Sequence, residues 1–192
     1  MRRIVCALFV GLVVTAAGAC GNSPTAPSNA PGTLSLMITD SPYSDARSLL
    51  VTFSEVTAHH SEVGGSNPLP FAGSATSRTC DLKKLVGAQD VLGVGALEAG
   101  HYTQLRLVVS SAVLYFDNAA TGPACAPTIT APAGRSATVE IPSGEVKLNR
   151  QFEVTTTAAT TILVDFDGDK SVHELGNGRF QMTPVISVVS VR

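Results

Sequence analysis

The 192-residue sequence contains no tryptophan, and aromatic residues make up only 5% of it. Charged residues are also scarce, at 15%, and no run or stripe of lysine and arginine is present. Without a basic surface, the sequence gives no support for nucleic-acid binding. The shortage of aromatic side chains leaves few platforms on which a sugar ring could stack: Tyr43, Tyr102, Tyr115 and Phe116.

Common catalytic motifs are missing as well. The sequence contains neither the G-x-S-x-G pattern of a serine hydrolase nor a phosphate-binding loop. His59 and His60 are adjacent, so on a strand they would point to opposite faces and could not share a metal. His101 and His173 stand far apart in the sequence. We therefore expect no enzymatic activity and no cofactor.

What is present suits a globular domain. Hydrophobic residues make up 44% of the chain, and its formal net charge is only −2. This composition is typical of a folded chain rather than a disordered one, and the length suffices for one domain and a tail.

The N-terminal segment indicates export. Two arginines precede an apolar run over residues 4–17, which is short for a transmembrane helix and typical of a secretory signal. The run ends in AAGAC (residues 16–20), which resembles a bacterial lipobox. We therefore expect a lipoprotein signal peptide over residues 1–19 and lipidation of Cys20. The alternative is an ordinary signal peptide cut at an A-x-A site, which would leave Cys20 as a free thiol.

The next segment is typical of a linker. Residues 21–33, GNSPTAPSNAPGT, contain three prolines, small polar residues and no charge. Residues 20–33 would thus be a lipidated cysteine and a tether, reaching up to about 40 Å in polyproline geometry. Gly21 rather than Asp follows the cysteine, which resembles the pattern for outer-membrane sorting in enteric bacteria. We expect a cell-envelope protein held on the outer membrane by its lipid.

The remaining cysteines form one pair. Cys6 would leave with the signal and Cys20 would carry the lipid, so Cys80 and Cys125 are left. In an oxidising envelope compartment, this pair predicts one disulfide. A two-cysteine metal site is the weaker alternative, because no histidine or further cysteine stands at ligand spacing beside either residue.

Residues 34–192 show mainly the pattern of β-strands. Along residues 101–116, Leu105, Leu107 and Val109 face one way and polar residues the other. Similar segments predict strands at 34–40, 48–56, 136–142, 145–149, 151–156, 160–167 and 180–191. One short helix is expected at 81–88, capped by Asp81. Many short strands favour an all-β fold, an antiparallel β-sandwich like that of prealbumin or immunoglobulin domains rather than a closed barrel.

Seven segments in a fixed order resemble a known family. They are LMITDSP, VTFSEV, CDLKKL, LEAGHYTQLRLVV, VKLNRQFEV, DFDGDKSV and GNGRFQMTPVISVV. Together they resemble the bacterial and archaeal envelope family called domain of unknown function 4382, over about residues 33–189. The resemblance implies a secreted or lipid-anchored β-rich domain and brings no known activity. Residues 59–70 and 118–135 match no family motif and are expected to be variable loops.

The most acidic segment is DFDGDKSVHELGNG, residues 165–178. Asp165, Asp167 and Asp169 supply oxygen ligands at alternate positions, as in a calcium loop. However, Lys170 stands where such a loop needs glycine, and Gly176 stands where it needs a bidentate glutamate. The resemblance also argues against calcium, because Asp169 falls at a variable position of the family pattern. The alternative is a structural ion pair between Lys170 and Asp165 or Asp167.

Taken together, these features predict a non-enzymatic, lipid-anchored module of the cell envelope that acts in binding, adhesion or assembly. Its partner besides the membrane would be an envelope or extracellular protein, or a glycan. The alternative is a calcium-organised or glycan-binding domain that uses the loop at 165–174.

Overall fold

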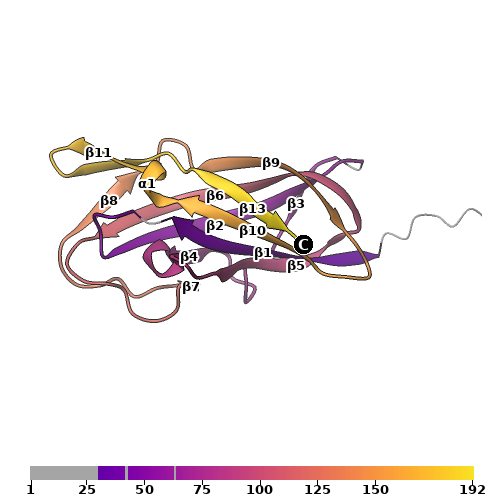
Figure 1. Ribbon diagram of the computed structural model, residues 1–192, viewed down its shortest axis with the longest axis horizontal. Helices are drawn as coiled ribbons and strands as arrows, with labels where there is room; N and C mark the ends of the chain where they lie inside the picture. The colour runs from indigo at the N-terminus through magenta and orange to yellow at the C-terminus, as the bar shows by residue number, and fades with distance from the viewer. Residues whose placement is uncertain (1–29, 42, 63) are drawn as a thin grey trace, which may run out of the picture.

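The computed structural model describes residues 30–192 except residues 42 and 63 (Figure 1). The predicted signal segment, Cys20 and the tether up to residue 29 lie outside the described residues. The elements in chain order are β1 (Pro31–Ser41), β2 (Ser48–His60), β3 (Ser66–Pro68), β4 (Arg78–Asp81), the 3-10 helix η1 (Leu82–Leu85), β5 (Asp90–Glu98), β6 (Gly100–Tyr115), β7 (Cys125–Ala126), β8 (Ser136–Glu140), β9 (Glu145–Val154), β10 (Thr160–Asp167), the one-turn helix α1 (Gly168–Ser171), β11 (Val172–Gly176), β12 (Arg179–Met182) and β13 (Ile186–Val191).

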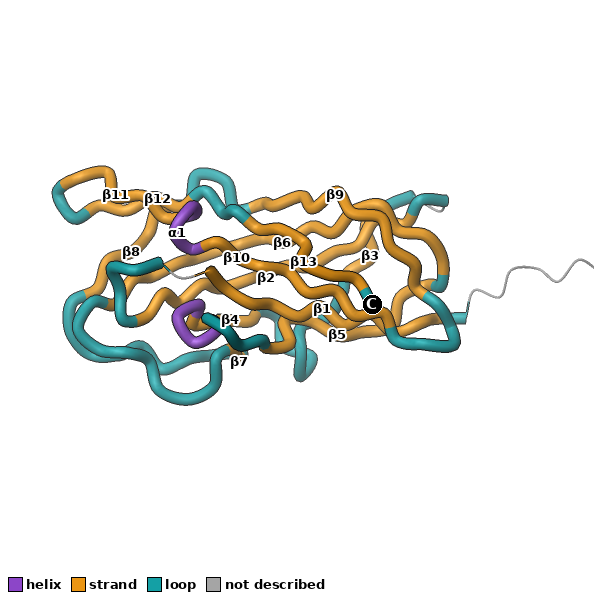
Figure 2. The backbone as a smooth tube through the Cα atoms, in the orientation of Figure 1, coloured by secondary structure: helices purple, strands orange, loops and turns teal. Residues whose placement is uncertain are grey.

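These strands form two sheets that pack face to face. The smaller sheet has the order β13-β10-β1-β5, and the larger has the order β11-β12-β8-β6-β2-β4-β7, with β3 paired to β2 and β9 to β6. Neighbouring strands are antiparallel except β1 with β10 and β12 with β8, which are parallel. Figure 2 shows the strands making up most of the chain. The predicted all-β sandwich is confirmed, with two parallel pairs added to it.

The core lies between the sheets and follows from the alternation of apolar residues. Along β1, Leu34, Leu36 and Ile38 are fully buried while their neighbours are partly exposed. Phe166 of β10 meets Phe53 of β2 edge to face, with ring centroids 6.3 Å apart. This contact joins the smaller sheet to the larger one.

Several predicted elements differ from the structure. The two strands expected at 145–149 and 151–156 form one strand, β9. A shift of its register against β6, between Tyr102 and Gln104, accommodates an extra residue of β9 without ending the strand. The single strand expected at 180–191 is two, β12 and β13, because Pro184 lacks the N–H that a ladder needs. β1 begins at Pro31, so the last residues of the expected tether belong to the domain.

The helix expected at 81–88 is only the single turn η1, and Asp81 does not cap it. The Asp81 carboxylate instead accepts hydrogen bonds from the Ser48 hydroxyl at 2.9 Å and the Leu49 amide at 3.2 Å. Gly87, with φ of +67°, turns the chain away just after this turn. Among the described residues, no helix is long and apolar enough to cross a membrane.

The sandwich has two distinct ends. At the tether end, β1 starts at Pro31, where Gly32 lies against Thr155, and β6 starts at Gly100 opposite Val154. At the far end, β1 and β10 both finish and β2 begins opposite Tyr115. Figure 1 shows β8, β11 and α1 at this far end, away from the start of β1. The 11 residues of β1 separate the two ends by about 35 Å.

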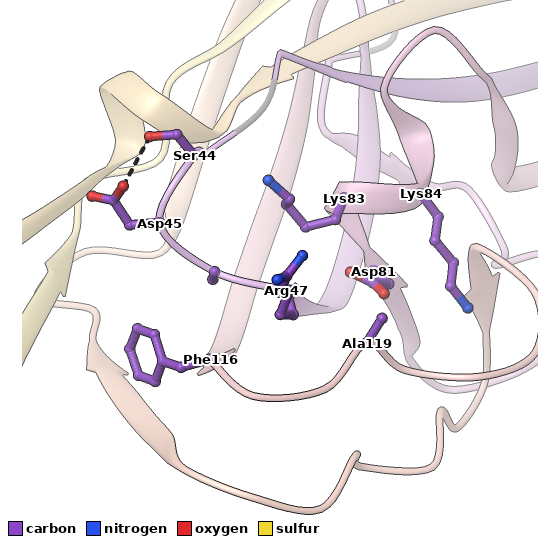
Figure 3. A pocket seen from close by; sticks show the side chains of 9 residues that line it. Ser44, Asp45, Arg47, Asp81, Lys83, Lys84, Phe116 and Ala119 are labelled. Carbon is purple, nitrogen blue, oxygen red and sulfur yellow. Dashed lines mark hydrogen bonds between the residues drawn. The ribbon is translucent and has the colours of Figure 1, made fainter.

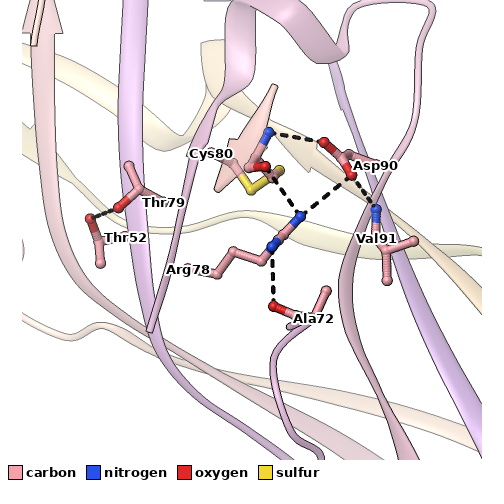
Figure 4. The surroundings of a disulfide bond; sticks show 8 residues. Thr52, Ala72, Arg78, Thr79, Cys80, Asp90 and Val91 are labelled. Carbon is pink, nitrogen blue, oxygen red and sulfur yellow. Dashed lines mark hydrogen bonds and ion pairs between the residues drawn. A yellow bond between two sulfur atoms is a disulfide. The ribbon is translucent and has the colours of Figure 1, made fainter. Parts of the chain in front are cut away.

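The predicted disulfide between Cys80 and Cys125 is confirmed. The two cysteines face each other across β4 and β7, with Cα atoms 4.1 Å apart (Figure 4). Arg78 lies beside the bridge, donating to the Cys125 carbonyl at 3.1 Å and pairing with Asp90 at 3.6 Å. Asp90 in turn accepts from the Cys125 amide at 2.9 Å. The bridge thus fixes the segment around residue 125 to the larger sheet.

We expect the double variant Cys80→Ser, Cys125→Ser to lower the free energy of unfolding by about 3–4 kcal/mol, because the unfolded chain regains the entropy of a loop spanning 45 residues. Chemical unfolding of the purified full-length chain measures this. A reducing agent should destabilise the wild type and leave the double variant unchanged. An equal effect of the reducing agent on both would contradict the assignment.

Candidate functional site

The acidic segment forms the end of β10 and the turn of α1. Asp167 caps α1, since its side chain accepts from the Lys170 amide at 3.0 Å and pairs with the Lys170 ammonium at 2.6 Å. The hydrogen bond from the Lys170 side chain holds the pKa of Asp167 below its usual value. Of the two ion pairs considered for Lys170, the structure therefore contains the one with Asp167.

The other two aspartates have separate partners. Asp165 accepts from the Ser41 hydroxyl at 3.0 Å instead of pairing with Lys170. Asp169 accepts from the Ser44 amide at 3.3 Å. Within the part of the chain that the structure describes, no group of three or more His, Cys, Asp and Glu residues is placed to hold a metal ion. The calcium interpretation of Asp165, Asp167 and Asp169 thus finds no shared ligand set here.

We expect calcium to leave the thermal unfolding midpoint unchanged, because protein groups already occupy these carboxylates and Lys170 neutralises Asp167. The measurement compares the purified full-length chain in EDTA with the same chain in millimolar calcium. A rise of about 5–10 °C that Asp167→Asn removes would instead establish a calcium site.

The sequence analysis missed a buried carboxylate beside this loop. Asp40 follows Leu34, Leu36 and Ile38 on the core face of β1 and is only 5% exposed. Among the described residues, neither of its carboxylate oxygens has a hydrogen-bond partner that meets normal geometry. The interruption of an apolar stripe by an aspartate was a visible signal for such a site.

The surroundings of Asp40 favour its neutral form. Burial raises the pKa of Asp40 to about 8, and the nearby negative charge of Asp165, with a smaller effect from Asp167, acts in the same direction. The Gly168 amide and the Lys83 ammonium oppose this rise without cancelling it. At neutral pH, Asp40 therefore carries a proton in most molecules.

This proton links the stability of the domain to pH. In the unfolded chain the pKa of Asp40 returns to about 4, so the folded state binds the proton more tightly between pH 4 and pH 8. Stability should then fall as pH rises through this window. Asp40→Asn keeps the shape without the charge, and we expect it to flatten this fall and to raise the free energy of unfolding at pH 8 by up to about 5 kcal/mol.

Chemical unfolding of wild type and variant from pH 5 to pH 9 tests this expectation. Asp45→Asn, at an exposed aspartate on the same loop region, is the matched control and should leave the pH profile unchanged. Parallel profiles for wild type and Asp40→Asn would contradict the role of this carboxylate.

The far end also carries a pocket of about 460 Å³ (Figure 3). Residues from three segments line it: Ser44, Asp45, Ala46 and Arg47; Asp81, Lys83 and Lys84; and Phe116 and Ala119. Its floor contains Asp81, whose side chain is fully buried and bonded to Ser48 and Leu49. Burial raises the pKa of Asp81, while the hydrogen bond from Ser48 opposes this rise.

A second pocket, of about 420 Å³, adjoins the first. Phe116 lines both pockets, and its ring lies 5.7 Å from that of Phe180. The Arg135 guanidinium lies 5.6 Å above the Phe116 ring and pairs with Asp117 at 3.1 Å. The far end therefore combines an apolar wall with charged rims, and one of the expected variable loops, 118–135, borders it.

The other expected variable stretch lies elsewhere. Residues 59–70 include β3, which pairs with the end of β2. His60 of β2 lies opposite Tyr102 of β6, at the tether end. His60 is buried there, edge to face with the Tyr102 ring at 4.9 Å. His101 pairs with Glu153 on the neighbouring strand.

Comparison with known proteins gives one result. The profile of the family described as domain of unknown function (DUF4382) matches residues 31–184. The chain belongs to this family. The DUF4382 match covers both parallel strands β1 and β10, the disulfide and all segments that line the two pockets. No curated protein matches the chain, and no solved structure does either.

Proposed function

We propose that this DUF4382 protein is a lipid-anchored, non-enzymatic binding module of the cell envelope that presents its far end to a partner. The export-like N-terminus and Cys20 support the anchor. The observation that carries the proposal is the placement of the two pockets at the far end, about 35 Å from the start of β1. A domain held through residues preceding Pro31 would direct this end away from its anchor.

The proposal places the protein on the outer membrane, with an envelope or extracellular protein or a glycan as partner. The disulfide supports an oxidising compartment, because such bonds persist there and are rare in the cytosol. The far end offers the concave, partly apolar surface with convergent polar groups that binding sites usually have.

The anchor is tested by labelling with a fatty-acid analogue in cells. We expect label and membrane fractionation in the wild type and loss of both in Cys20→Ser, because the lipid attaches only to this sulfur. Cys80 and Cys125 are joined to each other and serve as the internal control. Equal labelling of wild type and Cys20→Ser would refute the anchor.

The orientation is tested in the same cells with a photo-reactive residue. Placed at exposed Ala119 on the rim of the far-end pocket, it should cross-link the partner, whereas placed at exposed Ser66 near the tether end it should not. Loss of the Ala119 cross-link in the Cys20→Ser background would tie binding to anchoring. Equal cross-linking from both positions would refute a binding surface at the far end.

A further inference from the structure

The pocket at residues 44–47, 81–84 and 116–119 collects positive charge from two separate segments. Arg47 comes from the loop before β2, and Lys83 and Lys84 come from η1. Figure 3 shows Arg47 beside Lys83 in the middle of the pocket, with Asp81 between Arg47 and Lys84 in this view. Three cations around one concavity repel one another unless anions compensate them.

The acids nearby compensate this charge only in part. Asp45 accepts a hydrogen bond from Ser44 at 3.2 Å and is turned toward that residue, away from Lys83 (Figure 3). Asp81 attracts Lys84, but its side chain is fully buried in the floor of the pocket and bonded to Ser48. Asp40 lies close enough to Lys83 for electrostatic coupling, yet it is mostly protonated at neutral pH. The residues that line the pocket therefore include three cations, Arg47, Lys83 and Lys84, against two acids, Asp45 and Asp81.

The cations also have hydrogen-bond donors to spare. Lys83 donates to the Tyr43 carbonyl at 2.6 Å and Lys84 to the Gly122 carbonyl at 2.8 Å, so each ammonium keeps two of its three donors. Among the described residues, the Arg47 side chain has no hydrogen-bond or ion-pair partner, which leaves its five N–H groups free. The two carbonyl contacts hold the lysines in place, which lowers the entropy cost of binding.

The shape of the pocket limits the size of a ligand. Its volume of about 460 Å³ lies in the range of small-molecule sites, and the Phe116 ring forms an apolar part of its wall. A guanidinium fork matches the two oxygens of a carboxylate or phosphate, and the ammonium groups add charge.

We propose that this pocket binds a small ligand carrying at least two negative charges on oxygen atoms, with the Arg47 fork on the anionic group and Lys83 and Lys84 beside it. The proposal rests on the far-end binding role proposed above and names the ligand class for it. Phosphate groups and carboxylates share this chemistry, and separate titrations distinguish them.

The test is titration calorimetry on the purified full-length chain in detergent, with inorganic phosphate in one series and succinate in the other. We expect saturable binding of one of the two anions at one site per chain. Arg47→Gln should weaken that binding about tenfold or more, because it removes a charge-assisted pair of hydrogen bonds. Lys83→Gln should weaken it as well.

Arg150→Gln is the matched control, since Arg150 is also an exposed arginine and lies in β9, outside this pocket. It should change the affinity less than about twofold, as expected for screened charges far from a site. Thermal unfolding verifies that each variant is folded. If Lys83→Gln does not fold, the Arg47→Gln variant decides the test, because Arg47 is exposed. Absence of saturable binding for both anions, or equal weakening by Arg150→Gln, would overturn the proposal.

This result is independent of the anchor. Calorimetry in detergent requires neither lipidation nor membrane attachment, so anion binding can fail while Cys20 labelling and far-end cross-linking succeed. Conversely, an unlabelled Cys20 would refute the anchor and leave the anion site intact.

Discussion

The parallel pairing of β1 with β10 is the interaction on which the far end of this domain depends. Its register sets Thr39 opposite Asp165 and Ser41 opposite Asp167. Because parallel strands finish at the same edge of a sheet, the polar residues that end both strands come together there. Leu36 and Ile38 of β1 and Val164 of β10 are fully buried just before this edge, so the pairing places the polar residues directly beside the core.

Charge is divided across this edge. The acidic residues Asp165, Asp167 and Asp169 lie with α1 on one side, and the basic residues Lys83 and Lys84 lie with η1 on the other. Asp40 stands between the two groups, coupled to Asp165 and to Lys83 and bridged in backbone pairing to Val86. A proton on this carboxylate removes its repulsion with Asp165 and its attraction to Lys83.

Much of this fold was predictable from local patterns, and the reasons are specific. Alternation of apolar residues identifies β1, β6 and β10 because each has one face on the core. Pro184 indicates a break between two strands. The apolar residues on both sides of it nevertheless favoured one continuous strand over residues 180–191. β5 was missed because its glycines, Gly93 and Gly95, let it lie against Pro70 and weaken the apolar pattern.

The candidate site was less predictable, because it depends on contacts between distant segments. The aspartate-rich stretch stood out, and its Asp167–Lys170 pair follows from spacing in one turn. Arg47, Lys83 and Lys84 carry no motif, and only the meeting of the loop before β2 with η1 gives them a common pocket. Asp81 was expected to cap a helix, since the sequence does not reveal that Ser48 and Leu49 approach its carboxylate.

The disulfide has a consequence for when the pocket exists. The segment from Phe116 to Cys125, whose residues Phe116 and Ala119 line the pocket, is held to the larger sheet by the bridge at Cys125 and by hydrogen bonds such as that from the Asp81 amide to the Ala124 carbonyl at 2.7 Å. Without the bridge, this segment keeps only its hydrogen bonds to the rest of the domain, such as those from the Ala120 amide to the Ser48 hydroxyl and from the Cys125 amide to Asp90. The pocket wall at Phe116 and Ala119 would therefore be held less firmly in the reduced chain than in the oxidised one.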